Sequence, residues 1–290
     1  MPQFRGAIVR ERWKQAGLIF LSLLALVIVL KACTTTLIWA HNNSLFIGYA
    51  VLGIVTFLTY LASVRWIERR TVAEFTLPRS LSELADGVAT GLALFASVIG
   101  VLWAVGVYQP QGWGSAGELG LAAMFWLFIG VVEEILFRGL VYRLCCAVLG
   151  TWGAIVVSGL AFGLVHGIDP GATASALASV ALAGLMLGAA FALNGRLWLP
   201  IGIHAGWNFA EGSLFGTAVS GQNLGASLIE AKVAGPELLT GGRFGPEASL
   251  VSVIVLLVAT GFLVWRIAAL QRVEPPIWRA GKAAPSSGGA

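Results

Sequence analysis

Six side chains that could do chemistry lie in otherwise apolar stretches of this 290-residue chain. They are two carboxylates, a guanidinium, two of the three histidines and an amide: Glu133, Glu134, Arg138, His166, His204 and Asn208. No serine or cysteine among their neighbours is marked as a nucleophile. Carboxylates and imidazoles transfer protons, and imidazoles and amides stabilise an oxyanion. The set therefore favours hydrolysis of an amide by an activated water.

Helical spacing assigns these residues to faces. Glu134 and Arg138 are four residues apart, so they can pair on one face of a helix. Glu133 then lies about 100° away around the same helix and is free to face a cavity. His204 and Asn208 share the four-residue spacing and can point at one place.

Two schemes fit this set, and the residues alone leave both open. In the first, Glu133 is the general base for a water, His166 holds the same water or donates a proton, and His204 and Asn208 stabilise the oxyanion. In the second, zinc is held by His166, His204 and Glu133, and its fourth position is open for water.

The composition indicates what kind of protein positions these groups. Only 11% of the residues are charged, against about 25% in an ordinary soluble domain. Apolar residues make up 58%, and the mean hydropathy is +0.86. Such a chain is too apolar for a soluble fold or for disorder, and its three cysteines exclude a disulfide scaffold. We expect an all-α polytopic membrane protein.

Segments of about 20 apolar residues can cross a bilayer, and we predict eight of them. They run over 17–38, 45–64, 87–108, 119–141, 148–167, 172–193, 197–214 and 249–268. This divides the chain into N-terminal helices (1–118), a catalytic core in the fourth to seventh helices (119–214), an outer loop (215–248), a last helix (249–270) and a disordered tail (271–290).

Depth in the bilayer supports one site. With helix ends taken at Cys146, Thr151 and Arg196, the rise of 1.5 Å per residue places Glu133, His166, Asn208 and His204 at depths of about 20, 22, 18 and 12 Å. Buried polar groups in a membrane are costly, so their convergence indicates function.

Basic residues predict the orientation. With eight crossings, 15 of the 18 Lys and Arg residues lie on the side of both termini. The positive-inside rule then places both termini in the cytoplasm. The bias also explains the net charge of +4 without a nucleic-acid partner, so membrane lipid is the expected contact. Richness in Ala, Gly and Trp and short loops favour a bacterial inner membrane.

The three motifs resemble those of a known family. Glu133-Glu134-x-x-x-Arg138, Phe162-x-x-x-His166 and His204-x-x-x-Asn208 are similar, in order, to the motifs of the CAAX prenyl endopeptidase and bacteriocin-processing (CPBP, or Abi) intramembrane proteases. The segment 239–247 also resembles a loop of some bacterial members. The resemblance implies that Glu133 activates the water with support from Glu134 and Arg138, that His166 assists, and that His204 and Asn208 stabilise the oxyanion. It leaves the metal open.

We therefore expect an intramembrane endopeptidase that cleaves a membrane-associated peptide or protein. Two alternatives come from other classes. A non-catalytic immunity or scaffold protein would bind a partner without cutting it, and a proton-coupled transporter would use Glu and His as a relay. Against the transporter, no inverted repeat joins the two halves of the sequence.

Overall fold

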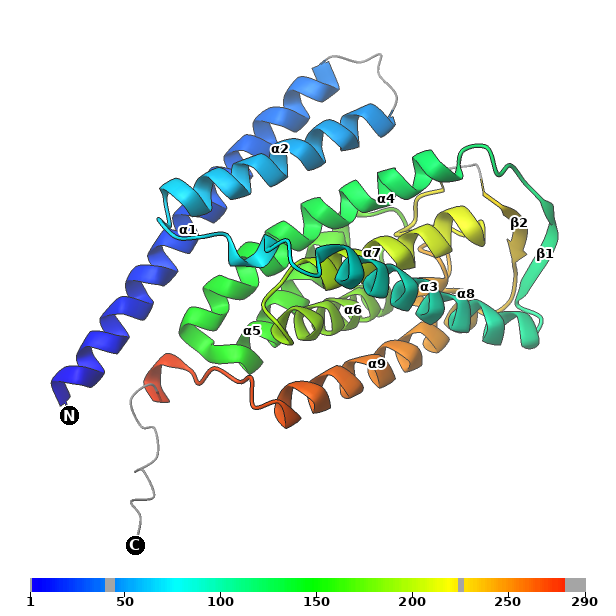
Figure 1. Ribbon diagram of the computed structural model, residues 1–290. Helices are drawn as coiled ribbons and strands as arrows, with labels where there is room; N and C mark the ends of the chain where they lie inside the picture. The colour runs from blue at the N-terminus through cyan, green and yellow to red at the C-terminus, as the bar shows by residue number, and fades with distance from the viewer. Residues whose placement is uncertain (1, 40–44, 224–226, 280–290) are drawn as a thin grey trace, which may run out of the picture.

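The computed structural model describes residues 2–39, 45–223 and 227–279. The long helices are α1 (Pro2–Trp39), α2 (Leu45–Trp66), α3 (Ser80–Ala104), α4 (Leu119–Glu134), α5 (Arg143–Val165), α6 (Ala174–Ala192), α7 (Trp198–Asn208) and α9 (Leu250–Ala269). α4 and α7 each continue into a π-helical segment, Ile135–Tyr142 and Phe209–Leu214. In Figure 1, α1 and α2 form an antiparallel pair beside α4, and the other long helices form the main bundle.

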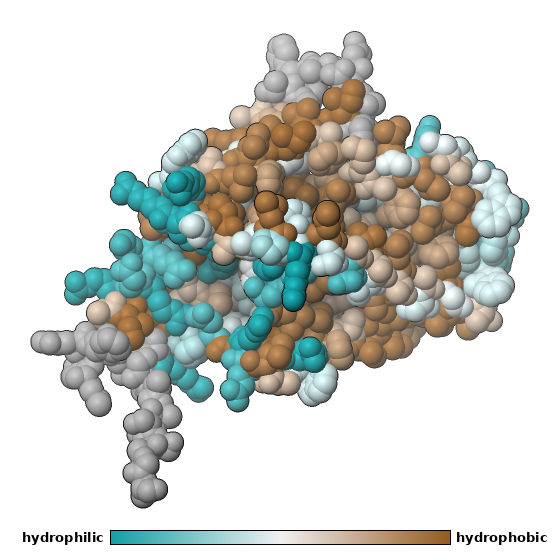
Figure 2. All heavy atoms as spheres, in the orientation of Figure 1, coloured by the Kyte–Doolittle hydropathy of each residue, from teal (hydrophilic) through white to brown (hydrophobic). Residues whose placement is uncertain are grey.

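The apolar surface confirms the predicted class, an all-α polytopic membrane protein. Among the described residues, six helical stretches are long and apolar enough to cross a membrane. One of them, 119–168, contains the fourth and fifth predicted spans, and its helix is broken at Gly150, whose φ is +74°. α7 with its π-helical extension ends at residue 214 and does not reach spanning length, so eight spans are not confirmed. Figure 2 shows the broad hydrophobic surface expected of an integral membrane protein.

Several boundaries differ from the prediction. α3 begins at Ser80 rather than at residue 87. A short sheet, unpredicted from the sequence, pairs β1 (Tyr108–Trp113) antiparallel with β2 (Ile229–Val233). The predicted outer loop 215–248 therefore contains a strand, and it also contains the short helix α8 (Glu237–Thr240). In the predicted disordered tail, Ile277–Arg279 forms a 3₁₀ turn, and 280–290 lie outside the described residues.

Small residues set the position of α7. α3 and α7 cross where Gly87 meets Gly202, and a Cβ added to either glycine would lie 2.9 Å from the Cα of the other. Only a backbone without side chains allows this approach, as in small-xxx-small packing of membrane helices. The close crossing holds the part of α7 that carries His204 and Asn208.

An ion-pair network ties the α2–α3 connection to the junction of α4 and α5. Arg143 pairs with Glu68 and Glu74, and Arg70 pairs with the same two carboxylates. Burial alone would raise the pKa of the Glu68 carboxyl, but hydrogen bonds and charges from Arg143 and Arg70 lower it overall. Because the folded-state pKa is depressed, this pairing stabilises the fold above the ordinary carboxyl pKa and is lost as the pH falls through the lowered value.

Replacing Glu68 by alanine should destabilise the folded chain by about 3 kcal/mol, because it leaves Arg143 half-paired in a largely buried site. Thermal unfolding in detergent would measure this. The matched control is Glu11→Ala, which removes an exposed partner of Lys14 and should change stability by less than about 1 kcal/mol. Equal losses in both variants would contradict the role given to the network.

Candidate active site

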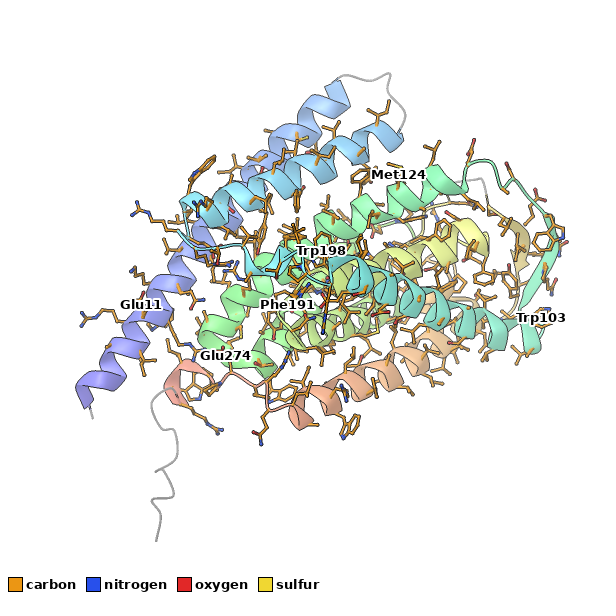
Figure 3. The ribbon with its side chains drawn as sticks, in the orientation of Figure 1. Glu11, Trp103, Met124, Phe191, Trp198 and Glu274 are labelled. Atoms are coloured by element: carbon orange, nitrogen blue, oxygen red, sulfur yellow. The ribbon has the colours of Figure 1, made fainter. Side chains whose placement is uncertain are left out.

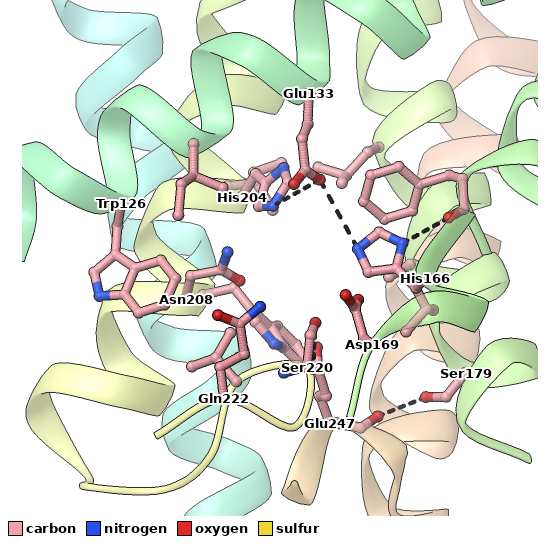
Figure 4. A pocket seen from close by; sticks show the side chains of 18 of the residues that line it. Trp126, Glu133, His166, Asp169, Ser179, His204, Asn208, Ser220, Gln222 and Glu247 are labelled. Carbon is pink, nitrogen blue, oxygen red and sulfur yellow. Dashed lines mark hydrogen bonds and ion pairs between the residues drawn. The ribbon is translucent and has the colours of Figure 1, made fainter. Parts of the chain in front are cut away.

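A cavity of about 230 Å³ collects four of the six predicted site residues. Glu133 of α4, His166 at the end of α5, and His204 and Asn208 of α7 all line it. In Figure 4 their polar ends face a common space. The other two, Glu134 and Arg138, are fully buried behind this wall and do not line the cavity.

Glu134 joins two of the predicted motifs. Its Oε1 accepts a hydrogen bond from Arg138 Nη1 at 2.7 Å and another from His204 Nδ1 at 2.9 Å. The second guanidinium nitrogen of Arg138 donates to the carbonyl of Gly184 on α6 at 2.9 Å, and the guanidinium lies 4.7 Å from the centre of the Phe162 ring. Charge-assisted bonds of this kind are the strong ones, so Arg138 and Glu134 hold the His204 ring in one orientation.

The hydrogen bonds decide which nitrogen each histidine presents to the cavity. A carbonyl oxygen can only accept, so His166 Nδ1, 2.7 Å from the carbonyl of Phe162, carries a hydrogen. His204 Nδ1 likewise donates to the Glu134 carboxylate. Both rings therefore turn Nε2 toward Glu133, at 4.0 Å from its Oε2 for His166 and 3.8 Å for His204.

Glu133 Oε2 lies between these two Nε2 atoms. It is buried and has no hydrogen-bond partner among the described residues. A buried carboxylate oxygen without a partner is costly, and one that faces a cavity is suited to accept a hydrogen bond from a small molecule such as water. Glu133 is thus the member of the set best placed to activate a water.

Phe162 supports both imidazoles. Its ring centre lies 4.8 Å from that of His166 and 5.8 Å from that of His204. The four-residue spacing of Phe162 and His166 predicted the first contact. The second joins α5 to α7, so one aromatic ring packs against both histidines.

Three polar residues at the other side of the cavity were not predicted as site residues. Asp169, Ser220 and Glu247 line it opposite Glu133 (Figure 4). Burial raises the pKa of the Asp169 carboxyl, the charge of His166 opposes this, and Glu133 adds to it. Burial also raises the pKa of the Glu247 carboxyl, which accepts hydrogen bonds from the backbone and the hydroxyl of Ser220.

Glu247 is the last residue of the glycine-rich segment 239–247, the stretch that resembled a family loop in the sequence. This segment forms part of the cavity wall opposite Glu133. Glu211, fully buried, holds the segment in place: it accepts the Glu247 backbone N–H at 3.1 Å and the indole N–H of Trp207 at 3.1 Å. Ser179 on α6 donates to the Glu247 carbonyl at 2.6 Å. The wall therefore rests on both α6 and α7.

The residues fit zinc in type but not in arrangement. Two imidazole nitrogens and a carboxylate oxygen are zinc-binding atoms. Nevertheless, no group of three or more His, Cys, Asp or Glu in the part of the chain that the structure describes is disposed to hold a metal ion. The separations of 3.8 and 4.0 Å between these atoms leave room for a water instead.

Comparison with known proteins gives one match. Residues 115–210 match the family described as Rce1-like, type II CAAX prenyl endopeptidase. The matched region contains all six residues of the predicted site. Neither a curated protein nor a solved structure is similar enough to count as a match. The match supports the family predicted from the three motifs: over residues 115–210, the chain is similar to the Rce1-like CAAX prenyl endopeptidases.

Proposed function

We propose that the protein is an endopeptidase of a bacterial inner membrane, with both termini in the cytoplasm, and that it hydrolyses a peptide bond of a membrane-associated peptide or protein. The observation that carries this proposal is the position of Glu133 Oε2, buried and unbonded between two imidazole Nε2 atoms. That arrangement provides a base, a second hydrogen-bond acceptor that can orient a water, and a space in which the water fits.

The proposed reaction begins with a water held between Glu133 and His166. Glu133 accepts one proton of the water, and His166 Nε2 accepts a hydrogen bond from the other. The water oxygen bonds to the carbonyl carbon of the substrate, and the carbonyl oxygen becomes an oxyanion. Glu133 then passes its proton to the leaving nitrogen as the C–N bond breaks. This releases an amine and a carboxylic acid, whose hydroxyl keeps the second proton of the water.

His204 and Asn208 stabilise the oxyanion in this scheme. His204 Nδ1 already donates to Glu134, so Nε2 can donate only when the ring is an imidazolium. The carboxylate of Glu134 at 2.9 Å favours that charged form. Asn208, one turn along α7, adds a neutral amide donor.

Replacing Asn208 by alanine should lower kcat by about 10²-fold with little change in KM, because an oxyanion donor acts mainly in the transition state. Initial rates on a membrane-inserted peptide would measure this. The matched control is Gln222→Ala, another amide that lines the cavity. A selective rise in KM for Asn208→Ala would contradict the oxyanion role.

The direct test of the function is mass spectrometry of peptides incubated with the purified chain. A single cut in the presence of the native protein, absent with Glu133→Gln, is the expected result. The same assay separates the two schemes. Loss of cleavage after chelation, with recovery on addition of zinc, would assign zinc to His166, His204 and Glu133, whereas full activity after chelation favours the water held by side chains alone.

A non-catalytic immunity or scaffold role, or a proton-coupled transporter, would leave every peptide intact. Partner binding that is unchanged by Glu133→Gln would support the scaffold, and proton-dependent flux in proteoliposomes would support the transporter. Neither role requires an unbonded carboxylate between two oriented imidazoles, so the protease is the function that the geometry supports best.

A further inference from the structure

The basic side chains of the described residues gather at one end of the molecule. They come from the start of α1, the α2–α3 connection, the α4–α5 and α6–α7 junctions and the chain after α9: Arg10, Arg12, Lys14, Arg65, Arg69, Arg70, Arg79, Arg143, Arg196, Arg266, Arg272 and Arg279. Hydrogen bonds confirm that these segments meet. Arg12 donates to the carbonyl of Pro275, and Arg272 donates to the carbonyl of Leu193. Figure 3 labels Glu11 and Glu274 at this end and Trp103 at the opposite one.

The far end carries few basic residues. Lys31, Lys232 and Arg243 are the only Lys and Arg there among the described residues, and the β1–β2 sheet lies at this end (Figure 1). The positive-inside rule therefore makes the end with the termini cytoplasmic and the end with the sheet external.

The catalytic cavity faces the far end. Part of its lining comes from the first two turns of α2 and α4, at Tyr49 and Phe125. Other parts come from His166, directly after α5, and from connections at the far end, at Ser220 and Glu247. No Lys or Arg within the described ranges lines it.

On the basic side, packed apolar residues close the site. Ile135 and Leu140 follow the catalytic carboxylates on the α4 extension, and Leu197 and Ile201 precede His204. These four side chains and Tyr60 belong to one core cluster, and each is 0% exposed. Because protein cores are close-packed, this cluster leaves no path for a peptide or for bulk water.

We propose that the active site opens to the non-cytoplasmic face of the membrane and that the substrate is an exported peptide or an external segment of a membrane protein. This inference rests on the proposed function and adds the side from which the substrate arrives. A substrate confined to the cytoplasm, such as a protein lipidated at its C-terminus on that side, would meet the closed, basic end.

Cysteine accessibility in intact cells tests the orientation without requiring activity. The three native cysteines, Cys33, Cys145 and Cys146, are replaced by alanine in the full chain. Single cysteines are then introduced at the far end, as Gln222→Cys at the cavity or Trp113→Cys on β1, and at the basic end, as Ser82→Cys. All three positions are exposed. The probe is a charged maleimide, which crosses the hydrocarbon poorly.

Both far-end cysteines should react in intact cells about tenfold faster or more than the Ser82→Cys variant, because the charged probe cannot cross to the cytoplasm. Permeabilised cells should remove the difference. Faster labelling at Ser82→Cys in intact cells, or equal labelling at both ends, would overturn the proposal. Peptide cleavage in detergent does not depend on orientation, so failure of the proposed function is seen separately as absence of any product.

Discussion

Replacing Glu133 by glutamine should lower the rate of peptide cleavage by about 10²- to 10⁴-fold, the range that general acid–base catalysis supplies. Glutamine keeps the shape of the side chain but cannot accept a proton from water. Single-turnover rates with the purified variant would measure the effect. Because Glu133 Oε2 has no hydrogen-bond partner among the described residues, the substitution breaks no hydrogen bond at that atom.

The control for this variant is Glu118→Gln, the same change at an exposed position before α4. It should leave the cleavage rate unchanged, and both variants should unfold at the temperature of the native chain. A Glu133→Gln protein that cleaves as fast as Glu118→Gln would remove Glu133 from the reaction, and with it the proposed mechanism.

Replacing Glu134 by glutamine should lower both stability and rate. Arg138 is 0% exposed, and this change leaves its charge without a carboxylate, which destabilises a protein by about 3–5 kcal/mol. The rate falls as well, because His204 Nδ1 loses the charged acceptor that orients its ring and stabilises its imidazolium form. Unfolding and cleavage measured on one preparation would show both losses.

A double variant separates the two effects. Adding Arg138→Gln to Glu134→Gln removes the unpaired buried charge, so stability should recover by about 2 kcal/mol or more. Cleavage should stay low, because no carboxylate returns to His204. If the rate recovers together with stability, Glu134 acts on the fold alone and does not position His204.

Much of this site is local and could be read from the sequence. The Glu134–Arg138 pair, the Phe162–His166 contact and the shared face of His204 and Asn208 follow from residues four apart on a helix, where neighbouring side chains meet without help from the rest of the chain. The membrane class likewise follows from composition, because few charges and long apolar runs leave no soluble alternative.

Other features lay beyond the sequence because they depend on distant segments. The β1–β2 sheet joins strands more than a hundred residues apart, and the wall with Ser220 and Glu247 is held by contacts of Glu211 and Ser179 with the backbone of Glu247. The predicted start of α3 was too late because residues 80–86 include polar side chains, and the prediction followed the apolar run that begins at residue 87. The first turns of α3 lie at the basic end of the molecule.

The sequence by itself determined that the protein lies in a membrane, which residues are candidates for its chemistry and which family their motifs resemble, because these depend on composition and on short helical spacings. Only the tertiary structure decided that Glu134 bonds His204 across 70 residues of chain and that Glu133 lies between two Nε2 atoms. These relations depend on how close α3, α4, α5 and α7 approach one another, and packing of glycines and buried charges sets that distance.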